Sequence, residues 1–263
     1  MSAPITNPDM LRFIQMRGSV TVMRVMQKIG LQYMDENPDI RLPLIGGGTT
    51  MGYKSILDGS SSIGMASGEM PPNIKLWADK NKLTLEKFPI AKDGIAPIVN
   101  IANPISDLSL EQLHGIFTGK ITNWNMLGKY SGPITVVSHD PQLGTYEHWK
   151  RQVAGKDHIT LKAKVVTNLT ELLHAITNDP YSIGYLGTTF LSQAKVKPIA
   201  VNGFMPNYQN ILTEQYPIRN ELQLLTRPSP SKEIKEFIAY CLNEKQGQVI
   251  IQAVGLVPIG AKS

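Results

Sequence analysis

Hydrophobic and polar positions along the chain switch repeatedly between a period of two and a period near 3.6. Near the N-terminus, a short alternating stretch at residues 11–16 precedes apolar residues that recur at helical spacing as far as Asn37. The same order returns with an expected strand at 40–45, a helix at 50–58 and a further strand at 62–66. Strands that alternate with helices predict an α/β protein with mainly parallel sheets flanked by helices.

The pattern continues to the C-terminus without a low-complexity linker. Further strands are expected at residues 85–90, 93–100, 134–138, 182–187, 197–201 and 221–226, and further helices at 71–82, 108–117, 146–153, 167–176, 234–242 and 248–254. This order predicts two lobes, one from residues 1–96 plus 216–263 and one from residues 97–215, with terminal helices that return to the first lobe. The crossings between the lobes are strands, which favours a hinge.

A glycine-rich turn, Gly46-Gly47-Gly48-Thr49-Thr50-Met51-Gly52, joins an expected strand to an expected helix. Such a turn directs free backbone N–H groups at one point, which suits an anion, although a turn that only packs tightly would look similar. A nucleotide-binding P-loop is excluded because Tyr53 stands where lysine is required.

Other strand ends carry similar small or hydroxyl residues. Ser19 and Thr21 follow the first strand, Ser67 follows the third, and residues 139–145 follow the strand at 134–138. In parallel sheets ligands lie beyond the carboxyl ends of the strands, so these turns are expected to meet. Helix capping is the alternative role for Ser19 and Thr21.

Composition limits the other possible functions. The chain has 263 residues, 42% hydrophobic and 18% charged, with a net charge of +5. The basic residues are dispersed, so nucleic-acid binding is not indicated. There is no apolar run long enough to span a membrane and no secretory leader, so the protein is either cytosolic or lacks a leader that was removed. Cys241 lies among apolar residues and is expected to be a packed thiol.

Catalytic and metal chemistry find little support in the sequence. The histidines lack metal-ligand spacing, and carboxylates such as Asp58 and Glu69 have simpler turn or helix-end roles. Met23, Met26 and Met34 follow helical spacing and indicate core packing. We therefore expect no enzyme activity, no cofactor and no metal.

A set of short motifs runs through nearly the whole chain in order. They are the glycine turn, Leu57-Asp58-Gly59, Ser62-Ile63-Gly64-Met65-Ala66-Ser67, Asp93-Gly94-Ile95-Ala96, the stretch from Leu113 to Trp124, Ser182-Ile183-Gly184-Tyr185, Gly247 to Ile251 and Gly255-Leu256-Val257-Pro258. Together they resemble the phosphate ABC-transporter substrate-binding proteins, most specifically from Phe117 to Trp124.

The resemblance implies a two-lobed type II periplasmic-binding-protein fold with a two-strand hinge and a cleft that closes on its ligand. It also implies capture of phosphate or a similar small oxyanion for an ABC permease, a monomeric protein, and a periplasmic or cell-surface location with the leader absent from this sequence. The family's ligand-contacting positions fall on Ser19, Val20, Thr21, Val22, Thr49, Thr50, Ser67, His139, Gln142, Gly144 and Thr145.

The chain departs from the family at its fourth turn. His139 stands where the family has arginine, Gln142 and Leu143 replace a glycine and a serine, and Gly68 replaces an arginine that many relatives carry. Arginine binds phosphate through two hydrogen bonds and is always charged, whereas histidine is charged only at acidic pH. A ligand-sensing or interaction module on the same fold, with an altered or lost phosphate site, is therefore the alternative.

Overall fold

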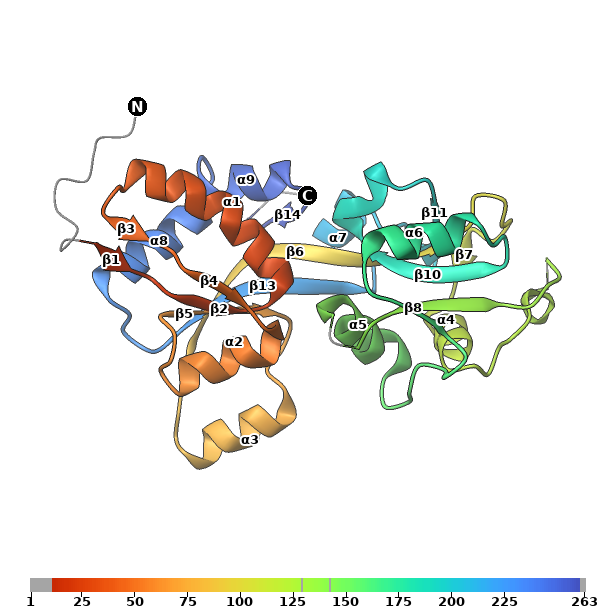
Figure 1. Cartoon of the computed structure of the whole chain (residues 1–263), viewed down its shortest axis with the longest axis horizontal. Coiled ribbons are helices and arrows are strands. Elements are labelled where there is room, and N and C mark those ends of the chain that lie inside the picture. Colours follow the sequence, from red (N-terminus) through yellow and green to blue (C-terminus); the bar gives the residue numbers. More distant parts are fainter. Residues whose placement is uncertain (1–10, 129, 142, 261–263) are drawn as a thin grey trace. The chain divides into compact units, whose positions relative to one another are not determined.

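The computed structural model describes residues 11–128, 130–141 and 143–260 (Figure 1). The chain divides into two compact units. Unit 1 comprises the described residues up to Lys92 and from Asn220 onward, and unit 2 runs from Asp93 to Arg219. The chain passes from one unit to the other inside strand β6 (Glu86–Val99) and returns at the start of strand β13 (Arg219–Thr226).

Unit 1 is built on a mixed sheet in the order β4-β2-β5-β13-β6, with β14 paired to β6 and a small separate β1–β3 sheet. Its elements besides β6 and β13 are β1 (Arg12–Phe13), β2 (Met16–Gly18), α1 (Val20–Glu36), β3 (Ile40–Arg41), β4 (Leu44–Gly46), α2 (Gly48–Leu57), β5 (Ile63–Ser67), α3 (Pro72–Lys80), α8 (Lys232–Leu242), α9 (Gly247–Ala253) and β14 (Val257–Pro258). Strand β2 is parallel to both β4 and β5, so the carboxyl ends of these three strands lie at one edge.

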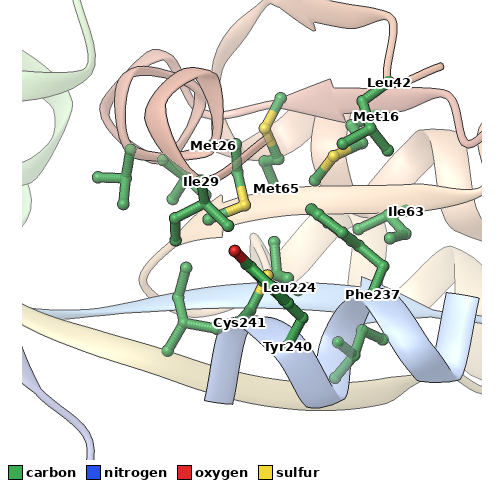
Figure 2. Packing of buried hydrophobic residues seen from close by; sticks show 14 of the residues in the cluster. Met16, Met26, Ile29, Leu42, Ile63, Met65, Leu224, Phe237, Tyr240 and Cys241 are labelled. Atoms are coloured by element: carbon green, nitrogen blue, oxygen red, sulfur yellow. The ribbon is translucent and has the colours of Figure 1, made fainter. Parts of the chain in front are cut away.

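The core of unit 1 lies between the sheet and helices α1, α8 and α9 (Figure 2). Met26 and Ile29 of α1 share this core with Phe237 and Cys241 of α8, and all four side chains are fully buried. Tyr33 packs edge-on against the Phe237 ring, with centroids 5.0 Å apart. The prediction that the terminal helices return to the first lobe is therefore confirmed, as are the packed methionines and the packed thiol, whose pKa burial raises.

Glycines let α2 lie directly against the sheet. A Cβ on Gly52 of α2 would overlap the carbonyl oxygen of Met65 in β5, and a Cβ on Gly18 of β2 would lie 2.8 Å from Gly52 Cα. Gly18 also has a φ of +137°, a conformation that other residues rarely adopt. The start of α2 is thus held close to the ends of β2 and β5.

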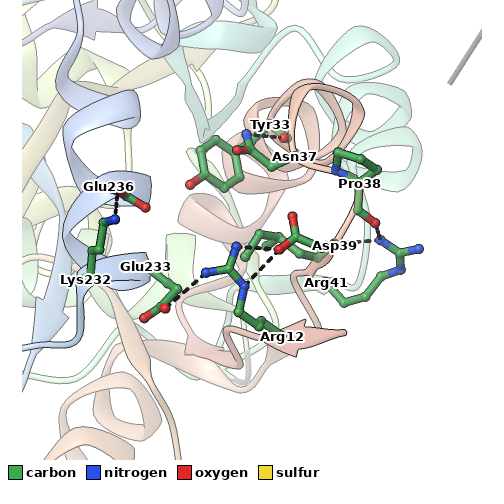
Figure 3. Close-up of polar contacts among 10 residues, drawn as sticks. Arg12, Tyr33, Asn37, Pro38, Asp39, Arg41, Lys232, Glu233 and Glu236 are labelled. Carbon is green, nitrogen blue, oxygen red and sulfur yellow. Dashed lines mark hydrogen bonds and ion pairs between the residues drawn. The ribbon is translucent and has the colours of Figure 1, made fainter. Parts of the chain in front are cut away.

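Polar contacts on the surface of unit 1 join its first strand, β1, to helix α8 (Figure 3). The Arg12 guanidinium pairs with the carboxylates of Asp39 and Glu233, with Nε at 2.9 Å from Asp39 Oδ2. The guanidinium lowers the pKa of Asp39, mainly through this hydrogen bond. Since these groups are exposed, the contacts fix geometry more than they add stability.

Unit 2 has a sheet in the order β6-β10-β8-β9, with β11 paired to β6 and a small β12–β7 sheet. Its elements besides β6 are β7 (Asp107–Leu108), α4 (Leu110–Phe117), η2 (Trp124–Leu127), β8 (Thr135–His139), α5 (Gly144–Trp149), η3 (Lys150–Ala154), β9 (Lys164–Val166), α6 (Leu169–Thr177), β10 (Ser182–Gly187), η4 (Thr188–Gln193), β11 (Lys197–Pro198), β12 (Ala200–Val201) and α7 (Tyr208–Leu212). Strand β8 is parallel to β9 and β10, and β10 is antiparallel to β6.

Aromatic packing fixes the end of α5 in unit 2. Trp149 stacks on Tyr185 of β10 with centroids 4.5 Å apart, and Phe117 meets both rings edge-on. All three side chains are fully buried, as is Trp124.

The sequence pattern was wrong about several strand limits. The two strands expected at 85–90 and 93–100 form the single strand β6, because it is paired with β14 at Lys92 and with β10 from Ile95 onward. The Asp93 carboxylate between them is buried and accepts the Gly94 N–H at 2.8 Å. The strand expected at 40–45 is divided into β3 and β4 around Pro43, which has no N–H to donate to a ladder.

The strand expected at 11–16 is also divided. Its first part, β1, pairs with β3, whereas β2 pairs with β4 and β5. The strand expected at 197–201 likewise becomes β11, paired with β6, and β12, paired with β7. In both cases consecutive residues join different sheets, which periodicity cannot reveal.

Candidate functional site

Three hydroxyl residues from separate turns of unit 1 meet at the carboxyl ends of its parallel strands. Ser19 follows β2 and caps α1, Thr49 lies in the first turn of α2, and Ser67 ends β5. The register explains the convergence, because Gly18 lies beside Gly46 on one side and Met65 on the other. We call Ser19, Thr49 and Ser67 the hydroxyl cluster.

The hydroxyl cluster is buried and hydrogen-bonded. Ser67 Oγ lies 2.8 Å from Ser19 Oγ and 3.1 Å from Thr49 Oγ1. Thr49 Oγ1 also accepts the Ser67 backbone N–H at 3.1 Å, and Ser19 Oγ accepts the Val22 N–H at 3.4 Å. The three side chains are 2–6% exposed. The helix-capping role expected of Ser19 therefore coexists with its place in the cluster.

Two helix starts give this cluster a positive electrostatic environment. Helices α1 and α2 both begin there, and neither has an acidic residue in its first turn. The first amides of a helix have no partner within the helix, and the helix dipole places partial positive charge at them. Anions are favoured at such a position without any charged side chain.

The other unit 1 residues predicted to contact a ligand have different environments. Val22 is buried in the core, Thr21 is half-buried, and Val20 and Thr50 are exposed. The Val22 N–H donates to Ser19 Oγ, whereas Val20 and Thr21 lie in the first turn of α1, where backbone N–H groups have no partner within the helix. The Thr50 hydroxyl is outside the hydroxyl cluster.

In unit 2 the predicted ligand residues lie around the turn between β8 and α5. His139 ends β8, while Gly144 and Thr145 open α5 after the cap residue Leu143, which offers no side-chain hydrogen bond. Gly144 and Thr145 are half-buried, and apart from the chain neighbours of Gly144 no described residue lies within 4 Å of the position of a Cβ on it. Gln142 lies outside the described residues.

His139 is turned into unit 2. Its Nε2 lies 3.1 Å from the Tyr185 carbonyl oxygen, and its ring packs edge-on against the Tyr185 ring at 5.0 Å. A carbonyl only accepts, so Nε2 carries the proton. Nδ1 is buried, has no hydrogen-bond partner among the described residues, and is an acceptor. Burial lowers the pKa of His139, and the carbonyl hydrogen bond opposes this only in part. At neutral pH the residue is therefore uncharged.

Sequence reasoning missed two buried residues of unit 2, of which Tyr185 contacts His139. Tyr185 contacts both the side chain and the backbone of His139, because its hydroxyl accepts the His139 backbone N–H at 3.2 Å. The same hydroxyl lies 3.0 Å from Ser138 Oγ. Asp93 is buried in unit 2, where Thr188 Oγ1 donates to it at 3.3 Å, and burial raises its pKa to about 6. Both belong to quoted motifs, but spacing alone does not show which groups face them.

The described part of the chain has neither a metal-binding cluster nor a membrane-spanning helix. Within residues 11–128, 130–141 and 143–260, no group of three or more His, Cys, Asp or Glu side chains is arranged to hold a metal ion. Over the same ranges, no helix is both long and apolar enough to cross a membrane.

Comparison with known proteins gives a consistent result. Residues 5–245 match the PBP superfamily domain. The chain is 27% identical over 247 residues to the phosphate-binding protein PstS of Bacillus subtilis, covering 92% of this chain and 79% of the relative.

Solved structures agree in fold. A putative phosphate ABC transporter substrate-binding protein from Clostridium perfringens, with bound phosphate, superposes with a TM-score of 0.79 at 28% identity, covering 94% of this chain and 100% of the other. An ABC-type phosphate transport receptor from Vibrio cholerae gives a TM-score of 0.84 at 27% identity, covering 93% of this chain and 99% of the other. The resemblance in the sequence motifs is thereby confirmed. The chain belongs to the PBP superfamily, with the type II periplasmic-binding-protein fold, in a family of substrate-binding transport proteins that are not enzymes.

Proposed function

We propose that this protein captures inorganic phosphate, or a closely related tetrahedral oxyanion, outside the cytoplasm and delivers it to an ABC permease. The hydroxyl cluster at the starts of α1 and α2 carries the proposal, because it combines buried hydroxyls with two helix N-termini that have no acidic residue in their first turns. The names of the relatives from Bacillus subtilis and Clostridium perfringens, both phosphate-binding, support it.

We assign ligand contacts to the hydroxyls of Ser19, Thr49 and Ser67 and to the amides at the start of α1. The predicted residues of the β8–α5 turn, His139, Gln142, Gly144 and Thr145, and the exposed Thr50, remain further proposed contacts. His139 would act as a neutral group, because burial lowers its pKa. The protein is proposed to act as a monomer.

Calorimetry with phosphate, sulfate and an uncharged polyol tests the function. Binding of phosphate should release or absorb heat and raise the unfolding temperature of the protein, whereas the polyol should do neither. Replacing both Thr49 and Thr145 by alanine should weaken phosphate binding at least about 100-fold, since two donors to a charged ligand are lost. An unaltered, folded protein that gives neither heat nor a thermal shift with any oxyanion would contradict the proposal.

A ligand-sensing module on the same fold is the second candidate. The observation that favours it is the buried, neutral His139 at a position where the family carries a permanently charged arginine. Stimulation of ATP hydrolysis by a permease in vesicles separates the two. A transport protein with phosphate bound should stimulate its permease, whereas a sensor should bind the oxyanion without this effect.

A further inference from the structure

A basic segment of unit 2 runs through η3 and the loop that leads to β9 (Figure 1, green). Residues 150–164 contain one acidic residue, Asp157, and five basic ones, Lys150, Arg151, Lys156, Lys162 and Lys164. Asp157 is itself paired, with Lys120 Nζ at 3.0 Å and His114 Nε2 at 3.2 Å. The segment is therefore strongly positive, although the whole chain has a net charge of only +5.

This segment contains a hydrogen-bonded turn with a leucine at one of its central positions. The Ala163 N–H donates to the Thr160 carbonyl at 3.0 Å, so Leu161 and Lys162 lie at the two central positions of the turn. The Thr160 N–H donates to the carbonyl of Phe117 at 2.8 Å, which fixes the turn to the end of α4. Leu161 is 102% exposed, the most of any large apolar side chain in the described ranges.

Lysines flank Leu161 along the chain. Lys156 and Lys162 are exposed and form no ion pair with another described residue. Lys164 is exposed as well and opens β9, the last strand of its sheet. We call residues 156–164 the lysine turn. It presents one fully exposed apolar side chain between exposed positive charges.

We propose that the lysine turn binds the anionic headgroups of a lipid surface, with Leu161 entering the boundary between headgroups and acyl chains. Lysines near such a surface are attracted to it, and their apolar stems let the amines stay among the headgroups while a neighbouring side chain goes deeper. A lone leucine can enter a fluid lipid surface, whereas a protein partner would need a pocket to receive it. Nucleic acid is disfavoured, because residues 150–164 contain no Phe, Tyr or Trp on which bases could stack.

The expected binding is weak and reversible. Each lysine at an anionic surface strengthens binding about fivefold, and partial burial of Leu161 adds about tenfold. Three lysines and the leucine give a partition constant on the order of 10³ M⁻¹, below the roughly 10⁴ M⁻¹ of a single myristoyl chain. The lysine turn therefore orients unit 2 at a lipid surface and does not anchor the protein there. Lipid binding requires no bound phosphate.

Sedimentation of the unaltered protein with vesicles at millimolar lipid is the first test. At about 50 mM potassium chloride, vesicles of phosphatidylglycerol and phosphatidylcholine should bind the protein at least about tenfold more tightly than phosphatidylcholine alone, and this binding should fall at about 300 mM salt. Equal binding to both vesicles, or none, would overturn the inference. A protein that still binds phosphate in calorimetry would then keep its proposed function, whereas lipid binding without phosphate binding would contradict that function alone.

Two exposed leucines separate insertion from attraction of charge. Leu161→Ser should weaken binding to the anionic vesicles at least about fivefold. Leu31→Ser, which removes a 68% exposed leucine from α1, should change it less than about twofold. In Leu161→Trp, phosphatidylglycerol brominated in its acyl chains should quench more fluorescence than in the unaltered protein, whereas Leu31→Trp should gain no quenching. Equal behaviour at the two positions would show that Leu161 does not enter lipid.

Two pairs of lysines with the same spacing test the charge. Lys162→Gln with Lys164→Gln should weaken binding to the anionic vesicles about 25-fold. Lys80→Gln with Lys82→Gln, at exposed positions of unit 1, should weaken it less than about threefold. Thermal unfolding and phosphate calorimetry should be unchanged in all variants. A single-stranded oligonucleotide that binds more tightly than the vesicles, and equally well to Leu161→Ser, would show a polyanion site and overturn the lipid assignment.

Discussion

Two neighbouring threonines at the start of α2 differ in what their side chains contact. Thr49 is 6% exposed and bonds to both the hydroxyl and the backbone N–H of Ser67. Thr50 is exposed and has no part in the hydroxyl cluster. The pair therefore separates the effect of a buried hydroxyl from that of a change in helix propensity at the same turn.

Thr49→Val should lower the free energy of unfolding by about 1–3 kcal/mol, because the similar shape keeps the packing but leaves the buried Ser67 N–H without its acceptor. Thr50→Val is the control and should change stability by less than about 0.5 kcal/mol. Urea unfolding followed by circular dichroism measures both. Equal losses in the two variants would mean that the Thr49 hydroxyl is not a stabilising partner.

A buried carboxylate in β6 gives the fold a pH dependence. Burial raises the pKa of Asp93 from 3.8 to about 6, against the hydrogen bonds from Gly94 and Thr188. Since the folded pKa is above the unfolded one, this group's stabilising effect is complete below about pH 4 and is lost as the pH rises through about 6.

Asp93→Asn should therefore raise the free energy of unfolding at about pH 8 by about 2–3 kcal/mol, because the amide keeps an acceptor for Gly94 without a buried charge. At about pH 4 the carboxyl is protonated, and the two proteins should unfold at similar urea concentrations. A variant that is no more stable than the unaltered protein at the higher pH would contradict the assignment of a costly ionised Asp93.

The sequence identified the residues of the hydroxyl cluster because each directly follows a strand, and parallel strands place their carboxyl ends together. It could not reveal the state of His139. Whether a histidine after a strand is exposed and charged or buried and neutral depends on Tyr185, which comes from the neighbouring strand β10. The hydrogen bond that Asp93 accepts likewise comes from a residue, Thr188, that is distant in sequence.

At the scale of elements, the position of α2 depends on contacts without side chains. Gly52 faces the Met65 carbonyl, and Gly64 of β5 faces the Gly52 carbonyl, with a Cβ 2.5 Å away if one were present. Backbone therefore packs on backbone, and the N-terminus of α2 reaches the ends of β2 and β5. Any separation of α2 from the sheet would move Thr49 away from Ser67.

Gly52→Ala should lower the free energy of unfolding by about 2–4 kcal/mol, because the added methyl overlaps a backbone atom that cannot rotate away. It should also weaken phosphate binding through displacement of Thr49. Gly187→Ala is the control, since its Cβ would meet its nearest neighbour at an ordinary 3.6 Å, and it should change neither stability nor binding appreciably. Both are measured by urea unfolding and calorimetry; similar behaviour of the two variants would contradict the packing argument.

Most elements could be placed from periodicity, because the apolar faces of α1, α6 and α8 are regular and turn residues separate them. The limits of the strands could not be placed in this way. β6 continues through Asp93-Gly94 because it is paired on both sides of that point, with β14 at Lys92 and with β10 from Ile95 onward. Local turn propensity was overridden by tertiary pairing.

At the scale of the whole molecule, the two units differ in how the chain builds them. Unit 2 is one continuous segment, whereas unit 1 is assembled from two segments on either side of it. Unit 2 has its own core, in which Val137 and Leu186 of the sheet pack against Leu172 and Ile176 of α6. Its continuity makes it a segment that can be tested for independent folding.

Residues at both ends of unit 2 bond to each other. The Ile95 N–H donates to the Ile218 carbonyl at 3.0 Å, and the fully buried Tyr216 donates its hydroxyl to the Ile95 carbonyl at 2.8 Å. A fragment of residues 93–219 keeps these contacts. A fragment of residues 97–215, the limits expected from the sequence, loses all of them.

The fragment 93–219 should fold cooperatively, with the buried Trp124 and Trp149 giving blue-shifted fluorescence that moves to longer wavelength in urea. The fragment 97–215 should be less stable by at least about 3 kcal/mol, because it lacks the large buried side chain of Tyr216 and the β6 residues that pair with the end of β10. Urea titration of both fragments, followed by tryptophan fluorescence and far-ultraviolet circular dichroism, measures the difference. Coincident transitions of equal midpoint would show that the contacts between Ile95, Tyr216 and Ile218 do not hold unit 2 together, and a gradual transition in the longer fragment would show that unit 2 needs unit 1 to fold.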